Sequence, residues 1–413
     1  MNQKSLVALV ALAAAGAASA QSSVTLFGTV DASVSSVSNT SRLASGGSAA
    51  LPGSIRSSKT GLNNSAQSSS AVGFRGVEDL GGGLAASFWL ETQVGNDEGT
   101  AGSGSTSTAS SQFFNRRSTV SLSGNFGEIR LGRDYKPTFW NYTRFSSFGT
   151  WGAGTSLLQR AAIAGAFEKD NVRSSNSIGY FLPSDLGGFY GQAQYAFHEQ
   201  AKYDSGLQGS LNDNSRGGRY LGARFGYANG PLDVAAAFAR STVTSSWTAG
   251  SDSVSSIFNL GASYDFGPVK LFGQYGNLKN RADYSAGYDA FNPATTMDGY
   301  ALGVTAPVGA GQFRASYGHV KIKVDQNPLS STYYTYQAPK ADQWALGYVH
   351  NLSKRTALYA TVAYIRNRNG AALSAGSTNI TASYATSYAY GGSTYAYTPK
   401  TSIGYDIGIR HNF

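Results

Sequence analysis

The chain contains no cysteine among its 413 residues, so no disulfide framework can hold it together. It also lacks long hydrophobic runs. Beyond a short stretch near the amino terminus, no segment approaches the ~20 apolar residues that a membrane-spanning helix needs, and the mean hydropathy is −0.23. A helical membrane protein is therefore excluded. A membrane β-barrel is not, because its strands alternate in polarity and average to a modest hydropathy.

Groups that could perform catalysis are also scarce. The four histidines are scattered, and no motif joins any of them to a serine or an aspartate: His198, His319, His350 and His411. No glycine-rich phosphate loop and no metal-spaced set of His or Cys residues is present. We therefore expect neither an enzyme nor a cofactor or metal site. The net charge of +9 could suggest nucleic acid, but the basic residues are scattered and the chain carries an export signal.

The amino terminus has the pattern of a secretory signal peptide. Lys4 gives a positive start, Leu6 to Ala18 is small and apolar, and Ala18-Ser19-Ala20 offers a small-x-small cleavage site. The apolar run is too short for a membrane span. We expect Sec-type export, with residues 1–20 removed and residues 21–413 forming one β-barrel domain.

The last strand has one apolar face and one polar face. Between Ser402 and Phe413, one face carries Ile, Tyr, His and Phe, and the other carries Ser, Gly, Asp, Arg and Asn. Side chains along a strand point alternately to opposite faces. Together with an export signal, this alternation predicts the closing strand of an outer-membrane barrel, with lipid outside and water inside.

Long and short connections alternate along the chain. Seven short turns rich in Gly, Asn, Asp and Pro separate eight longer stretches rich in Ser, Gly and Asn. The long loops are expected near residues 38–68, 96–112, 134–173, 199–217, 243–254, 278–297, 324–341 and 367–399. Fifteen connections predict an all-β, sixteen-stranded antiparallel transmembrane barrel, which is wide enough to leave an aqueous channel.

The third long loop, near residues 134–173, is unusually long and rich in aromatic residues. Loops of this length are usually functional or disordered, and disordered segments lack such aromatics. We expect the loop to pack, folded into the lumen so that it narrows the barrel. The alternative is a surface lid on the neighbouring loops.

Basic residues cluster around this loop and predict a pore constriction. Its candidate residues are Arg75, Arg116, Arg130, Arg133, Arg173, Asp134, Lys136, Glu168 and Asp170. Alternation points Arg75 and Arg130 inward and makes the adjacent Arg116 and Arg117 face opposite ways. For Arg133 a second possibility is contact with a neighbouring subunit. A ring of arginines would concentrate anions, although the loop itself, without Arg173 at its end, has a net charge of only +1.

The chain resembles the general porins of Gram-negative bacteria, most closely the β-proteobacterial type. The resemblance spans the mature sequence and rests on short motifs, which include Ser23–Gly28, Gly73–Leu84, Leu131–Arg133, Gly261–Asp265, Leu352–Thr356 and Gly408–Phe413. It implies a homotrimer of sixteen-stranded barrels in the outer membrane, each with its third loop inside. It also implies passive diffusion of small hydrophilic solutes and a terminal Phe413 that the barrel assembly machinery reads.

Members of this family carry a row of lumen arginines facing the third loop. Arg116, in Phe114-Asn115-Arg116, matches one position of this row, and Arg173 matches another. A third position of the row is Ala71 here, and Arg75 could partly compensate for that change. The Pro-Glu-Phe-Gly-Gly loop motif of enterobacterial relatives is absent.

These features predict a water-filled porin with weak anion selectivity. The alternatives are a substrate-specific channel for a sugar or an organic acid and a plugged, structural barrel. The expected partners are two further copies of the chain, outer-membrane lipid and lipopolysaccharide, the barrel assembly machinery, and small ions and solutes. Nucleic acid is not expected.

Overall fold

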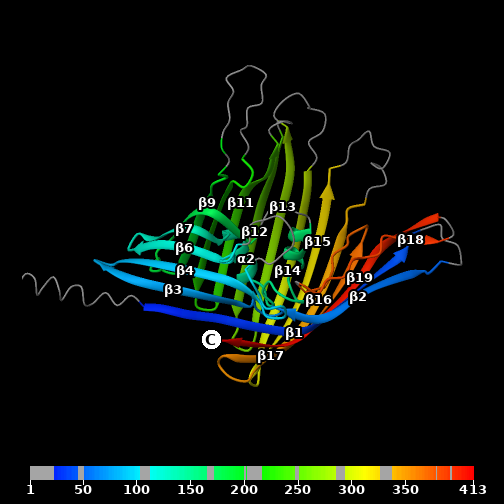
Figure 1. Ribbon diagram of the computed structural model, residues 1–413, viewed down its shortest axis with the longest axis horizontal. Helices are drawn as coiled ribbons and strands as arrows, with labels where there is room; N and C mark the ends of the chain where they lie inside the picture. The colour runs from blue at the N-terminus through cyan, green and yellow to red at the C-terminus, as the bar shows by residue number, and fades with distance from the viewer. Residues whose placement is uncertain are drawn as a thin grey trace, which may run out of the picture.

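The protein folds into a closed antiparallel β-barrel (Figure 1). The computed structural model describes residues 23–44, 51–102, 112–164, 172–199, 201, 216–246, 251–284, 294–325, 337–377, 379–390 and 393–413. The barrel closes where β1 (Ser23–Leu43) pairs with β19 (Ser393–Asn412) in an antiparallel register from Thr29 opposite Asn412. The predicted signal peptide lies outside the described residues.

The other strands follow one another around the barrel, and two short helices lie between β7 and β8. Their bounds are β2 (Ser54–Asn64), β3 (Ala71–Gly81), β4 (Leu84–Gly95), β5 (Thr100–Ala101), β6 (Arg117–Gly124), β7 (Gly127–Tyr135), α2 (Pro137–Arg144), α3 (Leu157–Ala164), β8 (Arg173–Phe181), β9 (Phe189–Ala196), β10 (Tyr220–Asn229), β11 (Leu232–Ser246), β12 (Ser251–Asp265), β13 (Lys270–Tyr284), β14 (Ala294–Val308), β15 (Gly311–Val324), β16 (Lys340–Asn351), β17 (Thr356–Arg368) and β18 (Ser387–Tyr390).

Sixteen barrel positions account for all of these strands except β5 and β18. β2 pairs with the second half of β1 and β3 pairs with its first half, so together they form one interrupted strand. The interruption falls at residues 65–70, where Ser65 adopts a φ of +70°. β5 and β18 are short arms within long loops. The predicted sixteen-stranded barrel is therefore confirmed.

The two faces of the wall differ in polarity. On β19, Ile403, Tyr405 and Ile407 are 43–62% exposed, whereas Ser402 and Asp406 are completely buried. The exposed apolar side chains form the outer face of the barrel, and the polar ones form the inner face. The arrangement suits a wall with lipid on one side and water on the other.

The strands extend further than the sequence pattern indicated. β1 and β2 continue well into residues 38–68, and β13 and β14 continue into residues 278–297. Antiparallel backbone hydrogen bonds can continue through Ser- and Thr-rich segments whose side chains give no apolar alternation. The seven short turns lie where they were predicted. Among the described helices, none is long and apolar enough to cross a membrane.

Candidate functional site

The described residues of the third loop, 136–164 between β7 and β8, pack against the inner face of the barrel wall. Asn259 Nδ2 on β12 donates a 3.0 Å hydrogen bond to the Thr138 carbonyl. Gln274 Nε2 on β13 donates a 2.7 Å bond to the Tyr142 carbonyl at the other end of α2. Wall side chains thus hold the loop by its backbone as well as by packing.

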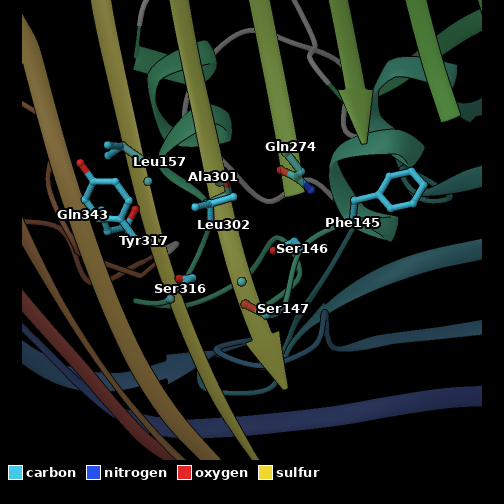
Figure 2. A pocket seen from close by; sticks show the side chains of 14 residues that line it. Phe145, Ser146, Ser147, Leu157, Gln274, Ala301, Leu302, Ser316, Tyr317 and Gln343 are labelled. Carbon is cyan, nitrogen blue, oxygen red and sulfur yellow. The ribbon is translucent and has the colours of Figure 1, made fainter. Parts of the chain in front are cut away.

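Close approach of loop and wall depends on a small residue on β12. A Cβ atom at Gly261 would overlap the ring of Phe145, which is 1% exposed. Figure 2 shows Phe145, Ser146 and Ser147 beside the strands that carry Gln274 and Ala301. The wall therefore has a recess into which the loop fits.

The tip of the loop is anchored by Asp406 on β19. The Ala153 backbone N–H donates a 2.6 Å hydrogen bond to Asp406 Oδ2, and the Ser35 and Ser377 hydroxyls donate to Oδ1 at 2.5 Å. A carboxylate that accepts several hydrogen bonds is a strong structural anchor. Asp406 thereby ties the third loop, β1 and the eighth loop to one point.

Arg160 on α3 joins the third and eighth loops. Its guanidinium donates hydrogen bonds of 2.7–3.2 Å to five backbone carbonyls, two of which belong to Ser374 and Gly376 in the eighth loop. Burial lowers the pKa of Arg160 to about 10. Because this pKa is still far above 7, the group stays charged at neutral pH, and the carbonyls take the place of water around it.

The eighth loop follows β17, and its described residues, 369–377 and 379–390, also include contacts with the inner face. Leu373, Ala375 and Ile380 are at most 5% exposed, and Leu373 and Ala375 pack with Leu157 and Leu158 of α3. The Ala375 N–H donates to Ser402 Oγ at 2.9 Å. The sequence did not distinguish this loop from a surface loop.

Three arginines meet at Tyr135, where β7 ends and the third loop begins. Arg116 Nη2 and Arg173 Nη2 donate hydrogen bonds of 2.7 and 3.1 Å to the Tyr135 phenol oxygen. The guanidinium carbons of Arg117 and Arg173 lie 5.6 and 4.5 Å from the centre of its ring. Guanidinium groups stack favourably on aromatic faces, so one tyrosine orients all three.

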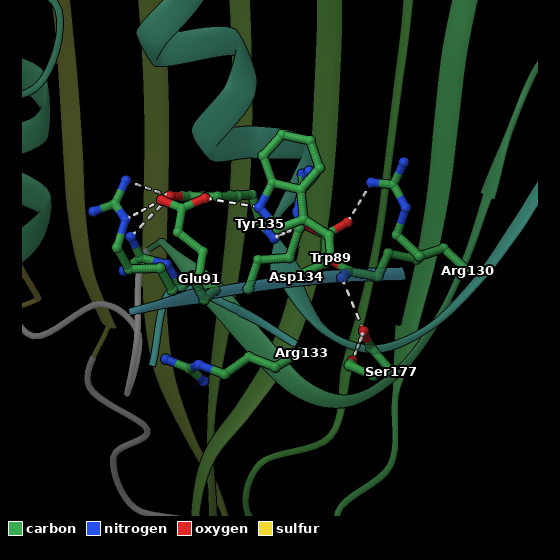
Figure 3. Close-up of polar contacts among 12 residues, drawn as sticks. Trp89, Glu91, Arg130, Arg133, Asp134, Tyr135 and Ser177 are labelled. Carbon is green, nitrogen blue, oxygen red and sulfur yellow. Dashed lines mark hydrogen bonds and ion pairs between the residues drawn. The ribbon is translucent and has the colours of Figure 1, made fainter. Parts of the chain in front are cut away.

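Asp134 neutralises part of this positive charge (Figure 3). Its two carboxylate oxygens accept from Arg117 Nε at 2.7 Å and from Arg130 Nη1 at 2.6 Å. Arg130 also binds Glu128, with nitrogen–oxygen distances of 2.8 and 2.9 Å. Charge-assisted pairs of this kind fix the position of a guanidinium as well as balancing its charge.

A second carboxylate and two aromatic rings complete the cluster. Glu91 pairs with Arg116 and accepts a 2.9 Å hydrogen bond from Trp89 Nε1. Arg75 lies over Phe27 and Trp89, whose ring centres are 4.8 Å apart, with its guanidinium carbon 5.3 Å from each centre. Within the described ranges, Arg75 contacts aromatic faces and forms no ion pair.

The structure brings four of the predicted arginines together on the inner face, namely Arg75, Arg116, Arg130 and Arg173. Lys136 is buried beside Tyr220, with Nζ 4.6 Å from the ring centre. Glu168 and Asp170 lie outside the described residues. The constriction role of these residues stays a prediction.

Arg133 belongs to the other face of β7. Its Nε donates to the Asn115 carbonyl at 2.7 Å and its Nη1 donates to Ser175 Oγ at 2.8 Å. Figure 3 shows its side chain pointing away from Asp134. Alternation through Gly132 places it there, so Arg133 does not join the arginines around Tyr135.

The expectation that Arg116 and Arg117 face opposite ways is wrong, because both contact Tyr135. β6 begins at Arg117, so Arg116 precedes the strand and the alternation rule does not apply to it. Arg117 was missed as a site residue. It shares a face with Thr119 and Ser121, opposite Val120, and this signal could have identified it.

The inner face around Tyr135 therefore holds more cations than anions. Arg75, Arg116, Arg117, Arg130 and Arg173 stand against three carboxylates, those of Glu91, Glu128 and Asp134. The described residues contain no group of three His, Cys, Asp or Glu side chains that could hold a metal ion.

Comparison with known proteins agrees with this architecture. Residues 5–370 match the Gram-negative porin family. Outer membrane porin protein 32 of Delftia acidovorans is 39% identical over the full length of both chains. An outer membrane porin of Bordetella pertussis is 29% identical over 84% of this chain and 89% of its own.

A solved structure gives the same result at the level of the fold. The anion-selective porin from Comamonas acidovorans superposes with a TM-score of 0.69 at 35% identity, covering 95% of this chain and all of the other. Porins are passive channels of the outer membrane and not enzymes. The chain belongs to the Gram-negative porin family, and its barrel is an outer-membrane channel.

Proposed function

We propose that this porin is weakly anion-selective. The observation that carries the proposal is the excess of arginines over carboxylates on the inner face around Tyr135. Fixed charges of one sign in a narrow, low-dielectric passage raise the local concentration of counter-ions and repel co-ions. The ion pairs at Glu91 and Asp134 reduce the excess, so the expected selectivity is weak. The anion selectivity of the Comamonas acidovorans relative supports the same sign.

The third loop is, in this proposal, the element that narrows the channel. Its backbone is tied to β12 and β13, which lie across the barrel from the strands that carry the arginines. Its tip is tied to β19, which is separated from β3 only by β1. The eighth loop, joined to it through Arg160, adds to the narrowing. Solutes would then pass between these loops and the arginine-bearing wall.

Single-channel recording in a planar bilayer tests this proposal. We expect stepwise currents in salt solution, with a reversal potential in a KCl gradient that favours chloride. A reversal potential that favours potassium would contradict the proposed anion selectivity. The absence of current from a folded barrel would contradict an open channel.

The alternative of a substrate-specific channel makes a different prediction in the same experiment. A sugar or an organic acid that binds in the lumen would block the ion current at low solute concentration. A general porin would show only the slight reduction caused by solute volume and viscosity. Titration with solutes of both classes therefore separates the two functions.

We also propose that the mature chain comprises residues 21–413 and assembles as a homotrimer among lipid and lipopolysaccharide. The barrel assembly machinery would recognise Phe413, whose N–H and carbonyl pair with those of Gly28 at 3.0 and 3.1 Å. Deletion of Phe413 should lower the amount of trimer on semi-native gels. Unchanged trimer yield would exclude the signal.

A further inference from the structure

The outer face of β13–β17 carries a row of aromatic side chains toward the long-loop end of the strands. Ring centres of Tyr300 and Tyr317 lie 6.1 Å apart, those of Tyr317 and Trp344 lie 5.4 Å apart, and those of Trp344 and Tyr364 lie 5.9 Å apart. Tyr275 stands opposite Tyr300 in the strand register. Such a row marks a membrane–water interface.

The apolar surface between this row and the short turns is as tall as the hydrocarbon region of an outer membrane. On β14 the outward residues from Tyr300 to Val308 are uncharged, with Leu302 57% exposed. Nine residues of a strand span ~30 Å, which becomes roughly 20–25 Å across the bilayer at the usual barrel tilt. The aromatic row therefore lies at the outer boundary of the hydrocarbon region.

A belt of basic side chains lies directly beyond the aromatic row, on the same outer face. Its members are Lys279, Lys321, Lys323, Lys340, Arg366 and Arg368. Among the described residues, two carboxylates lie within the belt, and Asp325 lies two residues beyond Lys323, where it accepts a 3.2 Å hydrogen bond from the Ala294 N–H. Asp298 is 3.5 Å from Lys323 Nζ, and Asp342 is 3.1 Å from Arg368 Nη2 and 2.8 Å from His319 Nδ1.

The strand register places like charges opposite one another within this belt. Lys321 on β15 stands opposite Lys340 on β16, and Lys340 stands opposite Arg368 on β17. Like charges in directly opposite positions destabilise a sheet. Three neighbouring cations at the membrane surface are stabilised when an anionic group lies between them.

We propose that this basic belt binds the phosphate groups of lipopolysaccharide in the outer leaflet. The acyl chains of the lipid would lie against the apolar band, the aromatic row would contact the sugar backbone, and the phosphates would lie among Lys321, Lys340 and Arg368. The inference rests on the proposed contact of the barrel with lipopolysaccharide and assigns that contact to one set of residues.

Lipid retention measured by native mass spectrometry tests the site. The full-length mature protein is loaded with bisphosphorylated lipid A, and the retained lipid is compared with that of the double variant Lys321→Gln, Lys340→Gln. Arg368 is left intact because it pairs with Asp342. The matched control is Lys354→Gln, Arg355→Gln, which removes two charges from the exposed short turn at the opposite end of the wall.

The belt variant should retain lipid A about tenfold more weakly than the unmodified protein, and the control should retain it normally. Single-channel conductance should be the same in all three proteins, which shows that each barrel is folded. The assignment would be overturned if the belt variant retained lipid A as well as the unmodified protein. It would also be overturned if the control variant lost lipid A as much as the belt variant. Failure of the unmodified protein to retain lipid A better than its dephosphorylated form would overturn the contact itself.

Discussion

At the residue scale, the arginines near the third loop are held by different partners. Arg117 and Arg130 share Asp134, and Arg116 pairs with Glu91. Arg75 instead lies over two adjoining aromatic rings. Exposed guanidinium groups that are oriented by aromatic stacking keep their full charge toward the channel. In the proposed anion-selective channel, we expect this difference to separate residues that shape the wall from residues that attract ions.

Removal of two arginines should shift selectivity toward cations. The double variant Arg116→Ala, Arg173→Ala loses two positive charges and two bulky side chains beside Tyr135. We expect a larger conductance and a several-fold lower permeability ratio of chloride to potassium. Reversal potentials in a KCl gradient measure this ratio. The control is Arg133→Ala, whose side chain points away, and an equal shift in the control would refute the assignment.

Removal of a carboxylate should have the opposite effect. Glu91→Gln leaves the shape of the side chain almost unchanged and deletes one negative charge beside Arg116. The reversal potential in a KCl gradient should then move toward the chloride equilibrium potential. A reversal potential that stays unchanged, or that moves toward the potassium equilibrium potential, would mean that Glu91 does not face the conducting path. Glu78→Gln, on the exposed end of β3, is the matched control.

Sequence patterns could place only some of these residues. Alternation alone correctly assigned Arg75 and Arg130 to the inner face. The ion pairs to Asp134 and the shared contact with Tyr135 could not be predicted, because they depend on the register between β6, β7 and β8. The alternation rule gave the wrong direction for Arg116 because this residue lies one position before the start of β6.

At the element scale, the position of the third loop depends on its anchors. Asp406 accepts hydrogen bonds from the loop tip and from two serines, and it is completely buried. Asp406→Ala should lower the free energy of unfolding by about 1–3 kcal/mol, because buried donors lose their acceptor. It should also increase current noise. Thermal unfolding measures the loss of stability, and open-channel recording measures the noise. The control is Asp185→Ala, at an exposed position.

A methyl group on β12 tests the fit between loop and wall. Gly261→Ala should push Phe145 out of its recess at a cost of about 1–3 kcal/mol and change the conductance. Gly273→Ala on β13 should be neutral, because the nearest side chain is 4.0 Å from the added Cβ. Equal behaviour of the two variants would mean that this recess does not position the loop.

The packing of the eighth loop was not predictable from its sequence. Its residues 371–382 are mostly Ala, Ser, Thr and Gly, with isolated Leu and Ile. Such a composition is typical of a surface loop and has no period of a helix or a strand. Its place is fixed by contacts with residues far along the chain, which include Arg160, Ser402 and Asp406.

At the scale of the whole molecule, the barrel could be predicted because turn chemistry and alternation agree along the chain. Short turns such as Asn229–Pro231 require Gly, Asn or Pro, and they mark one end of every hairpin. The length of the strands at the other end could not be predicted. There the wall continues in Ser-rich sequence beyond the lipid, where either face can be polar.

The reversal potential of the unmodified protein in a KCl gradient is the most direct test of the central claim, which is that a water-filled barrel has a net positive inner wall. The account predicts stepwise, ohmic currents and a potential displaced toward the chloride equilibrium value, with a smaller displacement at high salt because fixed charges are screened. A potential displaced toward the potassium value would contradict it.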